Sequence, residues 1–154
     1  MENTPTLLQV LLADDDIDDC HIFKDALEEL LLPVQLTIVN DGEELMHHLD
    51  EVTANLPDAL FLDLNMPRKN GFKCLEEIKR DEKFKTVPVI IYSTSYDDEK
   101  ANLLYNEGAN YYICKPADFN ELKEVVEHAL VLVQQNNLHP SREKFLLSTF
   151  KTNL

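Results

Sequence analysis

The sequence predicts an α/β fold in which a parallel sheet is covered by helices on both faces. Short apolar runs rich in β-favouring residues alternate along the chain with longer stretches whose apolar residues recur at helical spacing. Because each crossover between parallel strands takes a helix, five such alternations give a five-stranded sheet with five helices.

Five apolar runs have the length and composition of buried strands. They cover residues 7–13, 34–39, 59–62, 87–92 and 111–114. Runs such as LLQVLLA and VPVIIY are apolar at nearly every position, which is typical of strands buried on both faces.

Five longer segments have the i, i+3, i+4 spacing of amphipathic helices. They cover residues 17–31, 41–50, 71–80, 97–107 and 118–135. Asp41 with Glu44, and Asp118 with Glu121, have the spacing of an N-terminal capping box. Gly108 marks the end of the fourth helix.

Right-handed crossovers restrict the topology and favour a flavodoxin-like, doubly wound strand order of 2-1-3-4-5. In such sheets ligands bind beyond the carboxyl ends of the strands, where strands 1 and 3 lie side by side. A length of 154 residues suits one domain, at 1–136, and a short tail at 137–154. Apolar residues after Ser141 have the spacing of a short helix that packs on its own domain or on the partner in a homodimer; they are Phe145, Leu146, Leu147 and Phe150.

The formal net charge is −15, with 44% hydrophobic and 28% charged residues, which is the balance of a folded globular protein. Such negative charge repels phosphate backbones and anionic lipids, so we expect no direct DNA binding and no membrane binding. No apolar run approaches the roughly 20 residues that span a bilayer, and the first residues lack a basic signal-peptide region. The three cysteines have no metal-ligand spacing, which indicates buried, reduced thiols and a cytoplasmic location.

Chemically active side chains follow four of the five predicted strands. The first strand ends in Asp14, Asp15 and Asp16, the third in Asp63, the fourth in Ser93 and Thr94, and the fifth in Lys115 and Pro116. Because parallel strands share one carboxyl edge, we expect these side chains to meet at one rim of the sheet. The second strand ends without an obvious reactive group.

The carboxylates of Asp14, Asp15 and Asp63 are expected to lie close enough to repel one another, so at least one takes up a proton unless a cation is bound. Mg²⁺ prefers such hard oxygen ligands. Lys115 can bind phosphate as a point charge, and Ser93 can donate a hydrogen bond to a phosphoryl oxygen. We therefore expect Asp63 to carry a phosphoryl group, with Mg²⁺ and Lys115 neutralising its oxygens.

Each of these features also has an ordinary structural explanation when taken alone. An isolated run of acids is more often a turn and helix cap, and Asp16, Asp18 and Asp19 suit that role at the start of the first helix. The combination of acids, a hydroxyl and a lysine at four strand ends is what favours a functional site.

Four segments resemble the receiver domain of bacterial two-component response regulators, in particular the stand-alone, chemotaxis-regulator-like members. They are LLADDDIDD, LFLDLNMPRKNGF, VPVIIYSTS and GANYYICKP, within residues 7–135. The resemblance implies that Asp63 is the phosphorylated aspartate, and that Asp14 and Asp15, with the backbone carbonyl of Asn65, hold Mg²⁺ beside it.

The resemblance also implies that Ser93 and Tyr112 are switch residues, that Lys115 is the catalytic lysine, and that the peptide bond before Pro116 is cis. Tyr111 is the alternative switch aromatic. Strand alternation and the spacing to Lys115 favour Tyr112, and we expect Tyr111 to have a packing role.

For partners, the resemblance implies a sensor histidine kinase or a histidine phosphotransfer protein as the donor of the phosphoryl group. Phosphorylation is then expected to switch a partner-binding surface formed by the fourth helix, the fifth strand and the fifth helix. We expect no enzymatic turnover beyond Mg²⁺-dependent self-phosphorylation and dephosphorylation, and the tail is too short for an output domain. The IDD run and the loop DEKFKTVPVI look like those of receivers that work beside phytochrome-type or hybrid kinases.

Three alternatives remain at this point. A phosphatase of the haloacid-dehalogenase type needs a second aspartate two residues after its nucleophile, where this chain has Asn65, which cannot shuttle a proton. A degenerate receiver that binds partners without phosphorylation would not need the full set of site residues. A flavin-binding flavodoxin needs a phosphate loop after the first strand, where this chain has acids.

Overall fold

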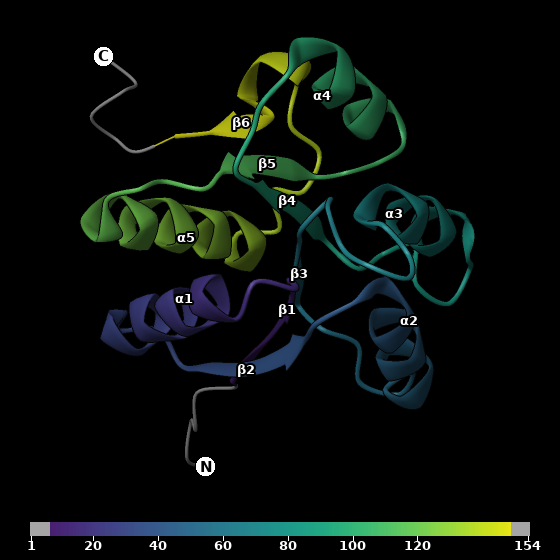
Figure 1. Ribbon diagram of the computed structural model, residues 1–154, viewed down its shortest axis with the longest axis horizontal. Helices are drawn as coiled ribbons and strands as arrows, with labels where there is room; N and C mark the ends of the chain where they lie inside the picture. Colours follow the sequence, from purple (N-terminus) through teal and green to yellow (C-terminus); the bar gives the residue numbers. More distant parts are fainter. Residues whose placement is uncertain (1–6, 149–154) are drawn as a thin grey trace.

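The computed structural model describes residues 7–148 and has the predicted α/β architecture (Figure 1). Its central layer is a parallel sheet in the order β2-β1-β3-β4-β5-β6. The strands are β1 (Leu8–Ala13), β2 (Val34–Val39), β3 (Ala59–Leu62), β4 (Val89–Ser93), β5 (Tyr111–Cys114) and β6 (Leu146–Leu147). The predicted order 2-1-3-4-5 is confirmed, and a sixth strand that was not predicted extends the sheet beyond β5.

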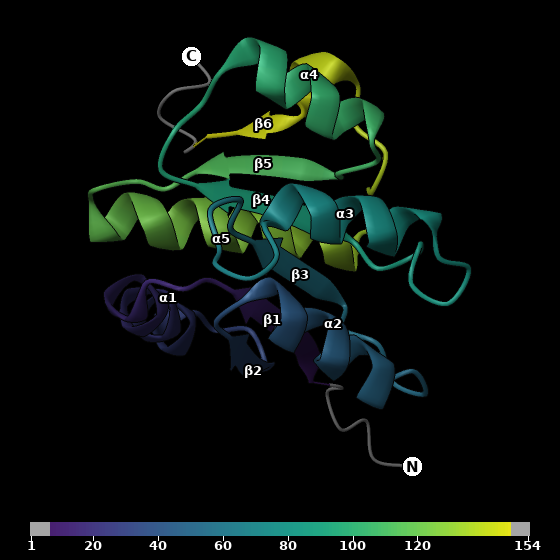
Figure 2. The same ribbon diagram turned by 45° about the vertical axis from the view of Figure 1, so that its right-hand side comes forward.

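Five α-helices cover the two faces of this sheet. They are α1 (Ile17–Glu29), α2 (Gly42–Glu51), α3 (Gly71–Arg80), α4 (Asp98–Asn106) and α5 (Phe119–Gln134), and a 3-10 helix, η1 (Arg142–Lys144), follows them. Helices α1 and α5 lie on one face, and α2, α3 and α4 lie on the other (Figures 1 and 2). The sheet therefore divides the core into two apolar layers, and side-chain alternation along β5 places Tyr112 in one layer and Tyr111 in the other.

Each α-helix begins after an Asp or Asn whose side chain accepts a hydrogen bond from a backbone N–H of the first turn. These residues are Asp16, Asp41, Asn70, Asp97 and Asp118. Such caps satisfy donors that the helix itself leaves unpaired. The predicted caps at Asp16, Asp41 and Asp118 are confirmed.

The prediction of a short helix formed by the apolar residues of the tail is wrong. Strand β6 pairs in parallel with β5, in a register that sets Leu146 beside Tyr112. Phe145 and Leu147 are buried whereas Leu146 is 37% exposed, so burial follows the period of two of a strand and not the period of a helix. Phe150 lies outside the described residues.

Two of the three cysteines lie in the core of the domain. Cys20 and Cys74 are buried as expected, but Cys114, at the end of β5, is exposed. Among residues 7–148, none of the helices has the length and apolar character needed to cross a membrane.

Candidate functional site

Three carboxylates meet at the carboxyl edge of the sheet, as the sequence predicts. Strands β1 and β3 are paired in register, and the N–H of Asp63 donates to the carbonyl of Ala13 (2.9 Å), so the residues after each strand lie side by side. One carboxylate oxygen each from Asp14, Asp15 and Asp63 lies within 4.8 Å of the others. Asp14 is fully buried and Asp63 is 6% exposed, whereas Asp15 is open to solvent.

This crowding changes the acidity of Asp63. Burial and the neighbouring charge of Asp14 raise its pKa from 3.8 to about 6, although Lys115 and the backbone N–H of Asn65 act in the opposite direction. That N–H lies 3.3 Å from Oδ1 of Asp63. The expected electrostatic conflict among the three acids is therefore present, and it falls mainly on Asp63.

Lys115, directly after β5, holds its ammonium group within this acidic cluster. Its Nζ donates to Oδ2 of Asp14 (2.7 Å) and to Oδ2 of Asp19 (2.9 Å), and lies 4.9 Å from the centre of the Tyr92 ring. Burial lowers the pKa of Lys115, but the bonds to Asp14 and Asp19 outweigh it and raise the pKa overall. Lys115 therefore remains a cation fixed beside the carboxylates.

Ser93 is the last residue of β4, and Tyr112 lies within the neighbouring strand β5; the hydroxyl groups of both contact the backbone of Ser95. Ser93 is fully buried, and its hydroxyl accepts a long hydrogen bond from the N–H of Ser95 (3.5 Å). The hydroxyl of Tyr112 donates to the carbonyl of Ser95, and its ring is 1% exposed. Burial raises the pKa of Tyr112, and a side-chain hydrogen bond with Ser93 opposes the rise. Tyr111 points to the other face, where its hydroxyl donates to the carbonyl of Asn137 (2.7 Å).

Backbone contacts hold Asp63 and the start of α3 together. The N–H of Gly71 donates to the carbonyl of Leu64 (3.0 Å), and a Cβ on Gly71 would lie 2.2 Å from the carbonyl oxygen of Asp63. A side chain at this position cannot be accommodated without movement, so the glycine permits the close approach of helix and strand end.

Two residues of the site were missed by the sequence analysis. Asp19 was expected only to support the helix cap, but its side chain accepts a hydrogen bond from Lys115. It can do so because Asp19 lies in the first turn of α1, a few residues after the end of β1. Asn40 follows β2, the strand that lacked an obvious reactive group, and its Nδ2 donates to the carbonyl of Asp14 (3.0 Å). Its position after a strand paired with β1 was the available signal.

The donor set fits a small, hard divalent cation. Three carboxylates, one of them solvent-exposed, offer oxygen ligands of the kind that Mg²⁺ prefers and leave room for water. A cation would also relieve the repulsion that raises the pKa of Asp63.

Comparison with known proteins agrees with this geometry. The family model described as the response regulator receiver domain matches residues 10–127. The chain belongs to the response regulator receiver family. Acceptance of a phosphoryl group is the shared role of receiver domains, which are signalling proteins.

Curated relatives of this receiver domain include two regulators of similar length. It is 30% identical over 121 residues to the probable methanogenesis regulatory protein FilR2 of Methanothrix harundinacea, covering 77% of this chain and 78% of that one. It is 28% identical over 122 residues to the response regulator Rcp1 of Synechocystis, covering 77% and 83%.

Solved structures show the same relationship. The phosphorylated cyanobacterial phytochrome response regulator RcpA matches the receiver domain with a TM-score of 0.78 and 31% identity, over 88% of this chain and 100% of that one. The Mn²⁺-bound form of Rcp1 matches with a TM-score of 0.71 and 26% identity, over 86% and 96%.

The cis bond that the resemblance implied before Pro116 is not found. Among the described residues of the receiver domain there are no cis peptide bonds. The trans form of an X–Pro bond is intrinsically favoured by about 0.5–1 kcal/mol. With the bond before Pro116 in this form, the side chain of Lys115 already reaches Asp14 and Asp19.

Proposed function

We propose that this chain is a single-domain response regulator that accepts a phosphoryl group on Asp63 from a histidine kinase or a histidine phosphotransfer protein. The observation that carries the proposal is the juxtaposition of three carboxylates within 4.8 Å and a lysine held 2.7 Å from one of them. A purely structural acidic cluster would not need a buried aspartate, a largely buried lysine side chain and a buried hydroxyl at one sheet edge.

Asp63 is the nucleophile in this proposal. One of its carboxylate oxygens bonds to phosphorus while the P–N bond of the donor phosphohistidine breaks. The electron pair of that bond stays on the ring nitrogen, and the ring leaves as neutral imidazole because its other nitrogen already carries a proton. Attack requires the ionised carboxylate, and with a pKa of about 6 Asp63 is largely ionised at neutral pH. Its raised pKa also indicates a strongly basic carboxylate, which favours attack on phosphorus.

Lys115 and Ser93 act on the phosphoryl oxygens. Lys115 is held close to Asp63 by its bonds to Asp14 and Asp19, so that its charge can neutralise one oxygen of the transferred group. Ser93, buried at the neighbouring strand end, donates a hydrogen bond to a second oxygen.

Mg²⁺ would be held by Asp14, Asp15, Asp63 and the backbone carbonyl of Asn65. When bound, it neutralises charge on the phosphoryl oxygens and on the acids around them. The expected reactions are limited to self-phosphorylation and dephosphorylation, because the side-chain amide of Asn65 cannot act as a general acid or base toward a leaving group.

Ser93 and Tyr112 connect phosphorylation to the surface of α4, β5 and α5. A phosphoryl group that draws the hydroxyl of Ser93 away breaks the hydrogen bond from the N–H of Ser95, whose carbonyl binds the hydroxyl of Tyr112, so the equilibrium position of this ring changes. The proposal includes a cytoplasmic location, where a soluble protein of this kind would meet the kinase domain of its donor. The proposal includes a phytochrome-type kinase as the donor class, because the relative RcpA is a cyanobacterial phytochrome response regulator.

Intact mass spectrometry tests the proposal. Wild-type protein is incubated with Mg²⁺ and acetyl phosphate beside Asp63→Asn, and Asp25→Asn serves as a charge-matched control on the exposed side of α1. We expect wild type and Asp25→Asn to gain the mass of one phosphoryl group, and Asp63→Asn to gain none.

An unchanged mass in wild type, with Mg²⁺ present, would refute the phosphoacceptor role. Sustained release of phosphate from simple phosphate monoesters would instead support a phosphatase. Light scattering after size-exclusion chromatography, with and without Mg²⁺ and beryllofluoride, tests the expected homodimer separately.

A further inference from the structure

The C-terminal extension, defined here as residues 137–148, is fixed to α4 and β5 by side chains from both elements. The hydroxyl of Tyr111 donates to the carbonyl of Asn137 (2.7 Å), and the hydroxyl of Tyr105 donates to the carbonyl of Pro140 (2.8 Å). The side-chain amide of Asn110 donates to the carbonyl of Leu138 (2.7 Å). Figure 2 shows the extension lying beside both β5 and α4.

Phe145 joins the extension to the switch aromatic. Its side chain is fully buried, with its ring centre 6.1 Å from that of Tyr112 and 5.3 Å from that of Tyr105. The backbone N–H of Tyr112 also donates to the carbonyl of Phe145 (2.9 Å). Tyr112 therefore contacts Ser95, two residues after Ser93, through its hydroxyl, and the extension through its ring and backbone.

Arg142 makes a second connection, to the loop that follows Ser93. Its guanidinium donates to the hydroxyl of Tyr96 (3.2 Å) and to Oδ1 of Asn102 on α4 (2.5 Å), and lies 5.6 Å from the centre of the Phe145 ring. The ring of Tyr96 packs edge-on against Tyr112 at 5.2 Å. Through Arg142 and Phe145, the extension therefore contacts both Tyr96 and Tyr112.

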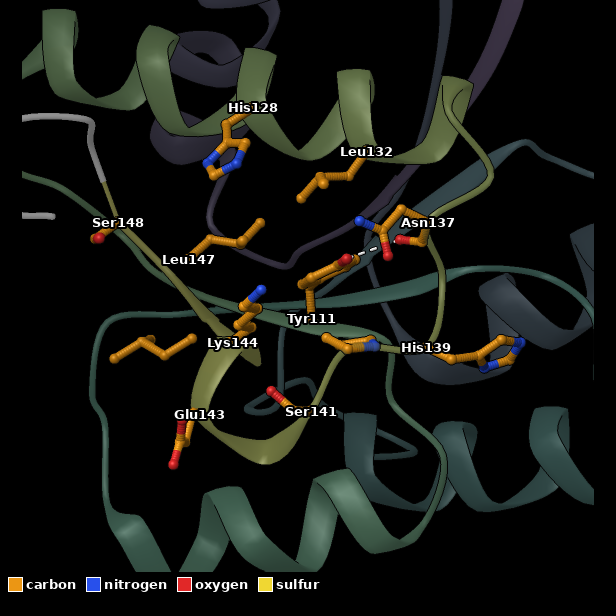
Figure 3. A pocket seen from close by; sticks show the side chains of 12 residues that line it. Tyr111, His128, Leu132, Asn137, His139, Ser141, Glu143, Lys144, Leu147 and Ser148 are labelled. Atoms are coloured by element: carbon orange, nitrogen blue, oxygen red, sulfur yellow. Dashed lines mark hydrogen bonds between the residues drawn. The ribbon is translucent and has the colours of Figure 1, made fainter.

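The other side of the extension is more open. Between the extension and α5 lies a cavity of about 520 Å³, into which His128 and Leu132 point from the helix and Leu147 from β6 (Figure 3). The hydrogen bond from Tyr111 to Asn137 crosses one end of this space. On this side Leu147 is buried in the same core layer as α5, whereas the hydrogen bonds from Tyr105, Asn110 and Tyr111 lie on the α4 and β5 side.

We infer that the extension is an intramolecular part of the switch, released when Asp63 is phosphorylated. The inference rests on the proposed function and identifies the extension as the segment that moves in response to phosphorylation. A phosphoryl group that draws the hydroxyl of Ser93 toward Asp63 moves residues 93–96, and with them the two tyrosine rings that Arg142 and Phe145 hold. The contacts that Arg142 and Phe145 make with the present positions of these rings are then weakened, and the surface of α4 and β5 becomes available to a partner.

Hydrogen exchange measured with mass spectrometry tests this directly. Wild-type protein is compared with and without Mg²⁺ and beryllofluoride, a phosphoryl mimic, and occupancy is confirmed independently by calorimetry. We expect peptides covering 140–148 to exchange faster in the mimic-bound state. Unchanged or slower exchange at confirmed occupancy overturns the inference while leaving the phosphoacceptor role intact; failure to bind the mimic would instead count against that role.

Thermodynamic reciprocity supplies the second test. If phosphorylation weakens the hold on the extension, then weakening that hold must favour phosphorylation by the same factor. Arg142→Gln and Phe145→Leu should bind beryllofluoride about fivefold more tightly than wild type. Lys144→Gln, an exposed cation of the same turn, should bind as wild type does.

Arg142→Gln alters a partly exposed side chain, so it keeps the test valid if the buried Phe145 variant does not fold. Equal affinities for wild type, Arg142→Gln and Lys144→Gln would show that the extension is not coupled to the site.

Discussion

Lys115 and Asp14, separated by 101 residues in the chain, form an ion pair in which the carboxylate is fully buried and the lysine side chain is 9% exposed. Its Nζ–Oδ2 distance is 2.7 Å. Each charge depends on the other because burial has removed most of the water that would otherwise stabilise it. Removing one partner therefore has a different effect from removing an ion pair at the surface.

Lys115→Met should lower the free energy of unfolding by about 3–5 kcal/mol at pH 7 without divalent cations, because Asp14 is left buried and unpaired. Added Mg²⁺ should restore part of this loss. Urea denaturation followed by circular dichroism, with EDTA or with Mg²⁺, measures both effects. Lys123→Met is the matched control, since the pair of Lys123 with Glu29 is partly exposed and should contribute less than about 1 kcal/mol. Equal losses in the two variants would contradict the special role of the buried pair.

The raised pKa of Asp63 predicts a pH-dependent stability. The folded state binds this proton more tightly than the unfolded state, where the pKa is near 3.8, so the contribution of Asp63 to stability is greatest below pH 4 and declines as the pH rises to about 6. A shift of this size corresponds to about 3 kcal/mol.

Asp63→Asn removes the titration, so without metal it should be more stable than wild type at pH 7, and the difference should shrink toward pH 4. Denaturation series at several pH values, with Asp25→Asn as the control, measure this difference. A difference that does not change with pH would show that Asp63 has an ordinary pKa.

Gly71→Ala should disturb the site through the backbone. The added methyl would lie 2.2 Å from the carbonyl oxygen of Asp63, so the start of α3 or the end of β3 must move. We expect a loss of about 1–3 kcal/mol in stability and weaker Mg²⁺ binding. Lys73→Ala, on the exposed face of the same helix, should leave both quantities nearly unchanged. Calorimetric Mg²⁺ titration of the two variants separates displacement of the site from a general effect on α3.

Asp15→Asn tests the exposed member of the carboxylate cluster. If Asp15 is a metal ligand, its loss should weaken Mg²⁺ binding by about tenfold or more. Asp18→Asn removes the same charge from the same acidic run, but from the first turn of α1 outside the cluster. Similar affinities for the two variants would mean that Asp15 acts only through its charge.

Much of the fold could be predicted because its signals are local. Apolar runs, helical periodicity and capping residues such as Asp41 and Asp118 predict the first five strands and the helices with small errors at their ends. The meeting of Asp14, Asp63 and Lys115 also follows, since parallel strands bring their carboxyl ends to one edge.

The remaining features depend on long-range contacts. Asp19 has the sequence pattern of a capping acid, and only the packing of α1 against the strand ends brings it to Lys115. The tail was misread for a similar reason. Two strand residues are too few to show a period of two, and the partner that makes β6 a strand is Tyr112, over 30 residues earlier.

Strand β6 also changes what the molecule presents at this side of the sheet. With β6 in place, β5 is an interior strand, and its backbone N–H and C=O groups on that side are engaged within the chain. The outermost strand in the described part of the protein is two residues long and beside a 3-10 turn, which makes it a poor template for uncontrolled pairing with other chains. Release of the extension would uncover the longer β5 edge, so a signalling event would create a transient site for strand addition that is closed at rest.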